Sequence, residues 1–305
     1  MPATEITQSN GNKATSMNYT DLQFFCPYCQ NALSLENQTF VCKECGKEFV
    51  FKEGIPSFIN NRYYYGSLSK EAAAHLIRMA MQNRIGEIKS YLAGLKIAGK
   101  KVFLRSFEDR FADGRFLVRL DRCSVVLDLG CGFGGLSVPI SKVCRQVVAV
   151  DATFERIQFL NIRARQEGLT NLIPVHANLL ELPLGDSMFD CVIINGVLEW
   201  TGEWCADKNP RDVQLLALKK SLDLLKPSGT RYLAIENRFG IELLYRRRDH
   251  NKLYFTSFMP RKMADLVTMV LRKKSYRTYT YSYSGYRKLL KDAGFTKIDF
   301  YCPWP

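Results

Sequence analysis

The sequence predicts an α/β fold built on a doubly wound, mostly parallel β-sheet, preceded by a small metal-binding module and a helical segment. Short apolar runs alternate with helical stretches from Cys123 onward, a spacing typical of parallel strands joined by crossover helices. A glycine-rich turn follows the first of these runs. Two C-x-x-C pairs stand near the N-terminus, ahead of the helical segment.

The length and composition set the frame for these elements. A chain of 305 residues can hold one core of about 180–200 residues and a smaller accessory domain. The sequence lacks the run of about 20 uncharged apolar residues that a membrane-spanning helix needs. Residues 1–20 are polar without an apolar signal core, so we expect a disordered tail on a cytoplasmic protein.

Residues 21–60 contain the two cysteine pairs, Cys26 with Cys29 and Cys42 with Cys45, separated by twelve residues. Two such turns facing each other across a hairpin place four thiolates around one metal ion. A redox function would need one C-x-x-C, whereas two copies at this spacing favour zinc. Four protein ligands leave no open position, so we expect a structural Zn²⁺ in a zinc ribbon.

Residues 61–122 are expected to form a helical connector or lid. Apolar residues recur there at steps of three and four, as in an amphipathic helix, at Leu76, Met79, Ile85, Ile88, Leu92 and Leu95. The run 102–118 also has a helical pattern. Helices at this place can cover a ligand on the following sheet or can simply pack against it, and the sequence favours neither.

Residues 123–305 carry the predicted α/β domain. Strands are expected at Val125–Leu129, Gln146–Val150, Leu172–Val175, Cys191–Ile194, Tyr232–Ile235 and Lys297–Tyr301. Helices are expected at Thr153–Glu167, Arg211–Leu225 and Tyr283–Ala293. The sequence ends just past the last predicted strand, so either the chain is truncated there or the sheet edge is completed by a partner, a dimer mate or another segment.

The turn "VLDLGCGFGGLS" at residues 126–137 fits two nucleotide-binding patterns. Gly130, Gly132 and Gly135 have the spacing of a dinucleotide site, whereas Gly130, Gly132 and Gly134 have that of an S-adenosylmethionine (SAM) site. An acidic residue after the second strand, Asp151, serves either ligand. Asp128 distinguishes them, because a carboxylate beside the turn repels a pyrophosphate and attracts the cationic amine and sulfonium of SAM. The sequence therefore favours methyl transfer.

The stretch from about 123 to 301 resembles the class I SAM-dependent methyltransferases, a Rossmann-like family, and specifically their methyltransferase-11-like branch. The resemblance runs through "VVLDLGCGFGG", "VVAVDATFERI", "HANLLELPLGDSMFDCVIINGVLEW", "LKPSGTRYLAIENR" and "LLKDAGF". It implies a donor site in which Asp128 and the glycines hold the methionine end and Asp151 the ribose. Asn178 stands where the family usually has an Asp near the adenine, and Asn195 faces donor and acceptor. The implied cofactor-binding residues are Asp128, Gly130, Gly132, Gly134, Asp151, Asn178 and Asn195.

Two residues are candidates for a catalytic base, Glu199 and His250. The Asn/Asp-Pro-Pro-Tyr pattern of amino-group methylation is absent, and "NGVLEW" stands in its place. His250 follows the fifth predicted strand beside Asp249, which could orient it. An exposed loop histidine and a packing carboxylate are the alternatives for these two residues.

The segment at about 238–282 is predicted to bind the acceptor. Between Arg238 and Lys291 there are 14 Lys and Arg residues against 3 Asp and Glu, together with many aromatic residues. Such a surface suits a phosphorylated or sugar-containing small molecule. The segment also resembles a group of bacterial methyltransferases of saccharide and cell-envelope biosynthesis. The run Met263–Leu271, flanked by basic residues, could instead contact an anionic membrane surface.

These patterns predict a SAM-dependent methyltransferase that O-methylates a saccharide, a sugar nucleotide or another small acceptor of cell-envelope or secondary biosynthesis. The alternative is an RNA methyltransferase of the rRNA guanine type, in which the zinc ribbon would contact RNA. The ribbon is poorly suited to RNA, because three lysines face five acidic residues between 21 and 53. A SAM-binding protein without transfer activity is a third reading, and a homo-oligomer stays open.

Overall fold

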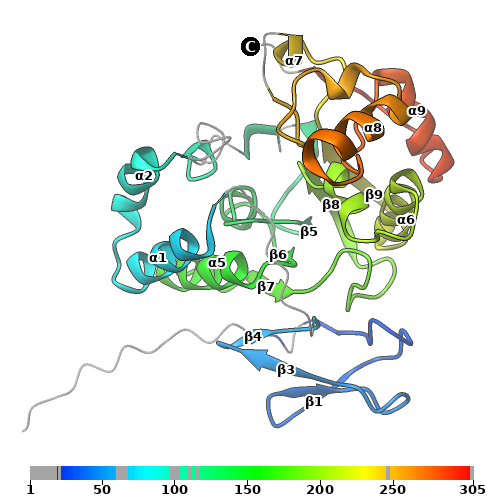
Figure 1. Cartoon of the computed structure of the whole chain (residues 1–305). Coiled ribbons are helices and arrows are strands. Elements are labelled where there is room, and N and C mark those ends of the chain that lie inside the picture. Colours follow the sequence, from blue (N-terminus) through cyan, green and yellow to red (C-terminus); the bar gives the residue numbers. More distant parts are fainter. Residues whose placement is uncertain are drawn as a thin grey trace, which may run out of the picture.

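The computed structural model describes residues 19, 22–59, 68–96, 104–108, 112–114, 117–244 and 248–302. The expected N-terminal tail lies almost wholly outside these residues. Figure 1 shows a small antiparallel sheet at one end of the molecule, a larger parallel sheet in the middle and a helical lobe at the other end.

The small sheet contains the strands β1 (Ser34–Glu36), β2 (Thr39–Val41), β3 (Glu48–Lys52) and β4 (Ile55–Pro56), paired in that order. Asn37 and Gln38 have φ values of 46° and 61° and close a two-residue hairpin between β1 and β2. Four phenylalanines fill its centre, with ring centroids between 4.9 and 5.8 Å apart, namely Phe24, Phe40, Phe49 and Phe58. This module therefore has an aromatic core as well as its cysteines.

The small sheet is docked on an edge strand of the large one, β7 (Leu172–His176). The backbone N–H of Phe58 donates to the His176 carbonyl at 2.9 Å, and Ser57 Oγ lies 2.8 Å from His176 Nδ1. On the other side of the module, the N–H of Phe25 donates to the Pro183 carbonyl at 3.0 Å. Buried residues of both sheets belong to one continuous apolar core, so the two parts form one folded unit.

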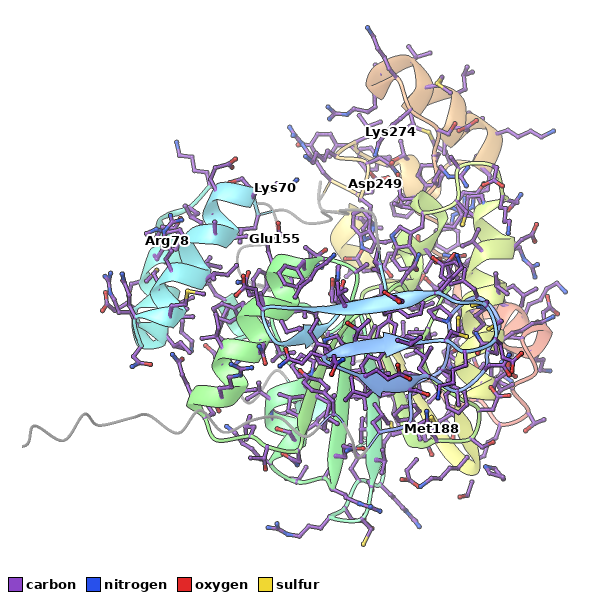
Figure 2. The ribbon with its side chains drawn as sticks, turned by 90° about the horizontal axis from the view of Figure 1, so that it is seen from below. Lys70, Arg78, Glu155, Met188, Asp249 and Lys274 are labelled. Atoms are coloured by element: carbon purple, nitrogen blue, oxygen red, sulfur yellow. The ribbon has the colours of Figure 1, made fainter. Side chains whose placement is uncertain are left out.

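The predicted helical segment forms two helices, α1 (Lys70–Met81) and α2 (Ile85–Gly94), rather than one. The break falls at 82–84, where Asn83 has a φ of 59°. Helix α1 packs along α5 (Phe154–Gln166), as Figures 1 and 2 show. The buried faces of α1 and α2 meet Phe133 of the glycine turn and Phe159 of α5. Of the helical run predicted over 102–118, residues 102–103, 109–111 and 115–116 lie outside the described residues, and the described ones include helical turns at 104–105 and 112–114.

The large sheet has five strands, β5 (Val125–Leu129), β6 (Gln146–Asp151), β7, β8 (Phe189–Asn195) and β9 (Leu225–Ala234). Their order is β7-β6-β5-β8-β9, and every neighbouring pair is parallel. Helices α4 (Ser137–Ser141), α5 and α6 (Pro210–Asp223) flank the sheet. Strands β5 to β8 are almost entirely buried. The predicted α/β fold class is confirmed.

The strand predicted at Lys297–Tyr301 is wrong, because these residues form no strand. Their alternating apolar side chains do contact the core, and Phe295, Ile298 and Phe300 pack half-buried against it. Phe295 lies under the Arg231 guanidinium of β9, 4.7 Å from ring centroid to Cζ. Packing of side chains without backbone pairing therefore produces the strand-like pattern. Among the described strands β9 pairs only with β8.

The helical lobe follows β8 and β9. It consists of η3 (Leu198–Glu203), α7 (Ile241–Leu244), η4 (Thr256–Phe258), α8 (Arg261–Arg272) and α9 (Tyr283–Asp292). The Arg261 guanidinium lies over the rings of Tyr276, Tyr279 and Tyr281, with Tyr279 at 4.1 Å. Tyr281 Oη donates to Gln214 of α6 at 2.8 Å, which ties the lobe to the sheet-flanking helix. None of the described helices is long and apolar enough to cross a membrane.

Leu76 of α1 tests the contact between the helical segment and the glycine turn. Its side chain is fully buried beside Phe133 and Phe159, so Leu76→Ala should lower the free energy of unfolding by about 2–5 kcal/mol. Met81→Ala at the exposed end of the same helix is the control and should change it by less than about 0.5 kcal/mol. Urea unfolding followed by circular dichroism measures both, and equal effects would contradict the packing described.

Candidate functional site

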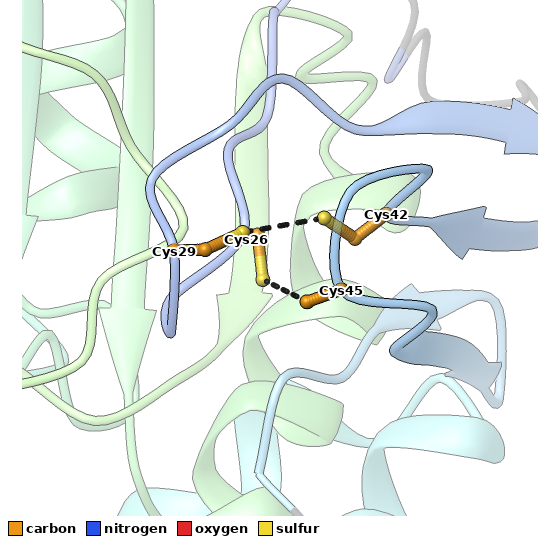
Figure 3. A group of neighbouring side chains, drawn as sticks. All are labelled: Cys26, Cys29, Cys42 and Cys45. Atoms are coloured by element: carbon orange, nitrogen blue, oxygen red, sulfur yellow. Dashed lines mark hydrogen bonds between the residues drawn. The ribbon is translucent and has the colours of Figure 1, made fainter.

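The four predicted zinc ligands come together in one cluster. The sulfur atoms of Cys26, Cys29, Cys42 and Cys45 all lie within 4.8 Å of one another, as Figure 3 shows. The distance from Cys29 to Cys42 is 3.4 Å and from Cys26 to Cys45 is 3.6 Å. Sulfur atoms at 2.3 Å from a tetrahedral zinc ion stand about 3.8 Å apart. The cluster therefore has the size and the ligand set of a Cys₄ zinc site.

Tight turns hold the cysteines in this arrangement. The N–H of Gln30 donates to the Cys26 carbonyl at 2.8 Å, and the N–H of Gly46 donates to the Cys42 carbonyl at 2.9 Å. Hydrogen bonds from Asn31, chiefly from its backbone N–H, lower the pKa of the Cys29 thiol to about 6. Metal binding needs the thiolate form, so the turn that positions Cys29 also favours its ligating state.

The glycine turn after β5 is left-handed at three positions. Gly130, Gly132 and Gly134 have φ values of 77°, 57° and 84°. A Cβ at Gly130 would lie 2.4 Å from Val197, and one at Gly134 would lie 2.3 Å from Leu160. A Cβ at Gly132 would have no atom of the described residues within 4 Å, so these residues leave room for a ligand to approach the backbone there. These are the three glycines of the SAM-type spacing.

Two carboxylates adjoin this turn. Asp151 ends β6, and its Oδ2 accepts the Gly132 N–H at 2.9 Å while its Oδ1 accepts the Thr153 N–H at 2.8 Å. Asp128 in β5 is buried and accepts the Ser137 hydroxyl at 2.6 Å. Burial raises the pKa of Asp128 to about 6, although the Ser137 hydrogen bond opposes the shift. Both predicted acidic residues thus lie at the turn, and a cationic ligand would favour the ionised form of Asp128.

The two predicted asparagines lie at the carboxyl ends of β7 and β8, two strands of the large sheet that β6 and β5 separate. Asn178 follows β7, and its Oδ1 accepts the Leu180 N–H at 3.0 Å. An amide oxygen has two lone pairs, so this atom can accept one more hydrogen bond. Asn195 is the last residue of β8 and is half-buried.

His250 and Glu199, both predicted as candidate bases, face each other. Glu199 lies in η3 after β8, and its Oε1 is 3.7 Å from His250 Nε2. A third group completes the cluster, because Glu236 Oε2, just after β9, lies 3.8 Å from His250 Nδ1. The Trp200 ring contacts the His250 ring edge to face at 4.7 Å. The imidazole is therefore held between two carboxylates and an indole.

The charges around His250 determine its protonation. Burial alone lowers the pKa of His250, but the Glu199 carboxylate and the charges of Glu236 and Asp249 outweigh it, so the pKa is raised. Glu199 is 2% exposed, and its Oε2 has no hydrogen-bond partner among the described residues. A buried carboxylate oxygen without a partner is costly in a packed core.

Asp249 was expected to orient His250, but its carboxylate contacts other groups. Its carboxylate accepts the N–H of Asn251 at 2.9 Å and the hydroxyl of Thr256. It therefore organises the loop that carries His250 instead of contacting the ring. Glu236 and Trp200, which do contact the ring, were missed in the sequence. Their positions directly after β9 and in "NGVLEW" could have revealed them, since ligand groups in parallel sheets gather at the carboxyl ends of strands.

The comparisons with known proteins agree with this geometry. A protein-family model described as "Methyltransferase domain" matches residues 127–233. A ubiquinone biosynthesis O-methyltransferase of Ruegeria pomeroyi is 31% identical over 113 residues, 37% of this chain and 41% of that protein. A ribosomal RNA small subunit methyltransferase G of Staphylococcus haemolyticus is 31% identical over 150 residues, 47% of this chain and 59% of that protein.

A solved structure of a SAM-dependent methyltransferase from Aquifex aeolicus superposes with a TM-score of 0.42 at 18% identity, covering 68% of this chain and 87% of that one. Mycobacterial proteins of uncharacterized function match over 24% of their own length. The chain thus spans from a quarter to about three-fifths of the curated relatives described here.

The parallel sheet, the left-handed glycine turn and the acidic residue that ends β6 are features of α/β nucleotide-binding domains. Residues 127–233 match a methyltransferase domain, and the parallel sheet has the class I methyltransferase fold. In this chain that domain follows an N-terminal module whose four cysteines fit a zinc ribbon.

The purified protein should contain about one zinc ion per chain when measured by inductively coupled plasma mass spectrometry. Cys42→Ser removes one of the four ligands and should lower the zinc content and the melting temperature together. Cys302→Ser, at an exposed cysteine outside the cluster, is the matched control and should retain the metal. Full zinc content in Cys42→Ser would show that the four thiols are not the ligand set.

The pKa of His250 should lie above the ordinary value of about 6.5, and that of His176 at about 4 because burial lowers it. Since folding raises the pKa of His250, its protonation stabilises the fold below pH 6.5, and this contribution is lost as pH rises through the folded value. NMR titration of the ring protons measures both groups, with the His250 signal assigned from His250→Gln. Glu199→Gln should lower the pKa of His250, and an unchanged value would rule out the carboxylate as its cause.

Proposed function

We propose that the chain is a SAM-dependent methyltransferase that O-methylates a saccharide, a sugar nucleotide or another small, negatively charged acceptor. The observation that carries this proposal is the cluster of His250, Glu199 and Glu236. It follows β8 and β9 at their carboxyl ends, and the glycine turn follows the carboxyl end of β5 in the same parallel sheet. Donor and acceptor chemistry would then meet at one sheet edge.

The donor would be held by the residues around the glycine turn. We propose that Asp128 and the backbone of Gly130, Gly132 and Gly134 bind the methionine end. Asp151 would bind the ribose hydroxyls in place of the Gly132 N–H, and Asn178 the adenine amino group through its free lone pair. Asn195 would lie between donor and acceptor. When bound, SAM supplies a methyl group on a positively charged sulfur, which nearby carboxylates favour.

The proposed base is His250 in its neutral form. It would take the proton of the acceptor hydroxyl at one ring nitrogen as the oxygen attacks the methyl carbon. Glu199 and Glu236 favour the imidazolium that results, because each carboxylate lies within 4 Å of a ring nitrogen. Glu199 Oε2 is a second candidate. It would either accept the proton directly or orient the acceptor. Trp200 would keep the ring in place.

The positive charge of the helical lobe favours an acidic acceptor over a neutral one. This charge is concentrated in the segment after β9, which also carries His250. The RNA alternative has support in the similarity to an rRNA methyltransferase, which is as high as that to an O-methyltransferase of ubiquinone biosynthesis. It is disfavoured by the ribbon, which carries more acidic than basic residues and pairs Lys43 with Glu36 at 3.7 Å. A surface that grips RNA needs uncompensated positive charge.

We also propose the division of the chain into a zinc ribbon at 21–60, a helical connector at 61–122 and a methyltransferase domain at 123–305 with an acceptor-binding insert at about 238–282. A cytoplasmic location is consistent with ten cysteines that form no disulfide among the described residues.

Incubation with methyl-labelled SAM and a cell extract, followed by separation into RNA, lipid-glycan and small-molecule fractions, tests the proposal. We expect label in the glycan or small-molecule fraction. His250→Gln should lower the transfer rate by about 10²–10⁴-fold while SAM still binds in calorimetry. Asp151→Ala is the control that should lose SAM binding itself. In the wild type the rate should rise with pH through the raised pKa of His250, because only the neutral ring accepts a proton.

Label that follows the RNA fraction and disappears with ribonuclease would replace this proposal by the RNA alternative. SAM binding that needs Asp151, without transfer to any fraction, would indicate a SAM-binding protein that is not an enzyme. Transfer at the wild-type rate in His250→Gln would exclude His250 as the base and leave Glu199.

A further inference from the structure

Helix α8 turns its large apolar side chains away from the protein. Met263, Leu266, Met269, Val270 and Leu271 are each between 47% and 70% exposed, and we call these five residues the α8 outer face. The buried residues of this helix are the small Ala264 and Thr268. A surface helix ordinarily buries its large apolar residues and exposes its polar ones, so this orientation calls for a partner.

The orientation of α8 is fixed by polar contacts on its inner side. The Arg261 guanidinium stacks on the Tyr279 ring at 4.1 Å and donates to the Thr280 carbonyl. Asp265 Oδ1 accepts the Tyr276 N–H at 2.8 Å. Rotation that would bury the outer face would break these contacts. The exposed apolar surface is therefore a built feature of the lobe.

Positive charge surrounds the outer face. Residues 261–274 contain one acidic residue, Asp265, and five basic residues, of which Arg261 lies on the inner side and Lys262, Arg272, Lys273 and Lys274 are exposed. Lys262 and Lys273 are exposed and form no ion pair with any residue that the structure describes. Figure 2 shows the side chains of α8 near Lys274 projecting outward from the molecule. Charge of one sign around an apolar strip is the pattern of helices that lie in a membrane interface.

A strained aromatic residue lies next to α8. Phe255 has a φ of 64°, which bulky residues rarely adopt, and its side chain is 45% exposed. It begins η4, which packs against α8, and its ring contacts Phe258 at 6.4 Å between centroids. Backbone strain that presents an aromatic ring to the outside is typical of functional surfaces.

We propose that the α8 outer face lies on the surface of an anionic lipid bilayer, with the helix parallel to the membrane plane. The apolar side chains would enter the acyl boundary while Lys262 and Lys273 contact the headgroup phosphates. Figure 1 shows α8 at the end of the molecule opposite the zinc ribbon, so the ribbon would point away from the membrane.

Charge complementarity selects this occupant over the other two candidates. RNA would satisfy the lysines but would leave the five apolar side chains in water. A second copy of the chain would cover the apolar strip but would bring two sets of lysines together, which repel each other. An anionic bilayer satisfies both features. The proposal does not depend on methyl transfer, and its test does not measure activity.

Sedimentation of the full chain with phosphatidylcholine vesicles, with and without phosphatidylglycerol, tests the proposal. The wild type should bind the mixed vesicles and bind the neutral ones at least about tenfold more weakly. The triple variant Leu266→Gln, Val270→Gln and Leu271→Gln should lose at least about tenfold in vesicle affinity. Lys262→Gln with Lys273→Gln should lose about fivefold per lysine and with it the preference for anionic lipid.

The control variant carries Met81→Gln and Leu216→Gln, two exposed apolar residues on other helices, and should bind vesicles as the wild type does. Because the substituted residues are exposed, all variants should keep the wild-type melting temperature. Equal binding to neutral and anionic vesicles, or equal binding by the triple variant, would overturn the proposal. A dimer that the triple variant abolishes would assign the face to a second copy, and RNA binding lost only with the lysines would assign it to RNA.

Discussion

The left-handed turn between β5 and α4 is the constraint on which the other parts of the structure depend. The Val150 carbonyl accepts the N–H groups of both Gly130 and Cys131, at 2.8 and 3.0 Å, so the turn is fastened to β6. Val197 closes over Gly130 from the segment after β8. A side chain at Gly130 would separate these segments, because positive φ and close contact coincide there. One backbone conformation thus sets the spacing between three strand ends.

The same turn connects the sheet with the helices that precede it. Phe133 points from the turn into the cluster formed by α1, α2 and Phe159, with 5.4 Å between the two ring centroids. The Asp151 side chain reaches the turn from β6 and accepts the Gly132 N–H. The Asp151 carbonyl accepts the Ala177 N–H, which links the turn to the segment after β7. The helical segment therefore packs against the end of the domain that carries the glycine turn, and whether it also covers a ligand there stays a prediction.

The sequence predicted the central strands well because burial leaves a plain pattern. Strand β5 has the predicted bounds, and β6, β7 and β8 differ from prediction by one or two residues at an end. Strand β9 begins seven residues earlier than predicted, since Pro227 and Gly229 resemble breakers but are tolerated at an edge of the sheet. The strand predicted at 297–301 failed for the opposite reason, because Ile298 and Phe300 alternate without backbone partners.

Some residues of the candidate site could be predicted from the sequence and others could not. The spacing of the four cysteines and of the three glycines is enough to predict that each group comes together, since its members are close in the chain. The environment of His250 could not be predicted, because Glu199 and Glu236 reach it only after η3 and the segment following β9 have packed. Gln214 of α6 holds that packing with hydrogen bonds to the Leu198 and Tyr279 carbonyls, at 3.1 and 2.8 Å. Contacts across such separations leave no local pattern in a sequence.

The docking of the ribbon on β7 has a consequence for how the chain is made. Ser57 meets His176 across a sequence separation of 119 residues, so during synthesis the ribbon leaves the ribosome long before its docking strand exists. Until then the module must keep its shape from four thiolates and a few phenylalanines. The availability of metal at that stage would decide whether the ribbon docks on β7. Without the ribbon, β7 would present an open strand edge, and edges of that kind pair with other chains. If the four thiolates hold zinc, scarcity of zinc would cause aggregation of newly made protein before any loss of activity in the folded protein.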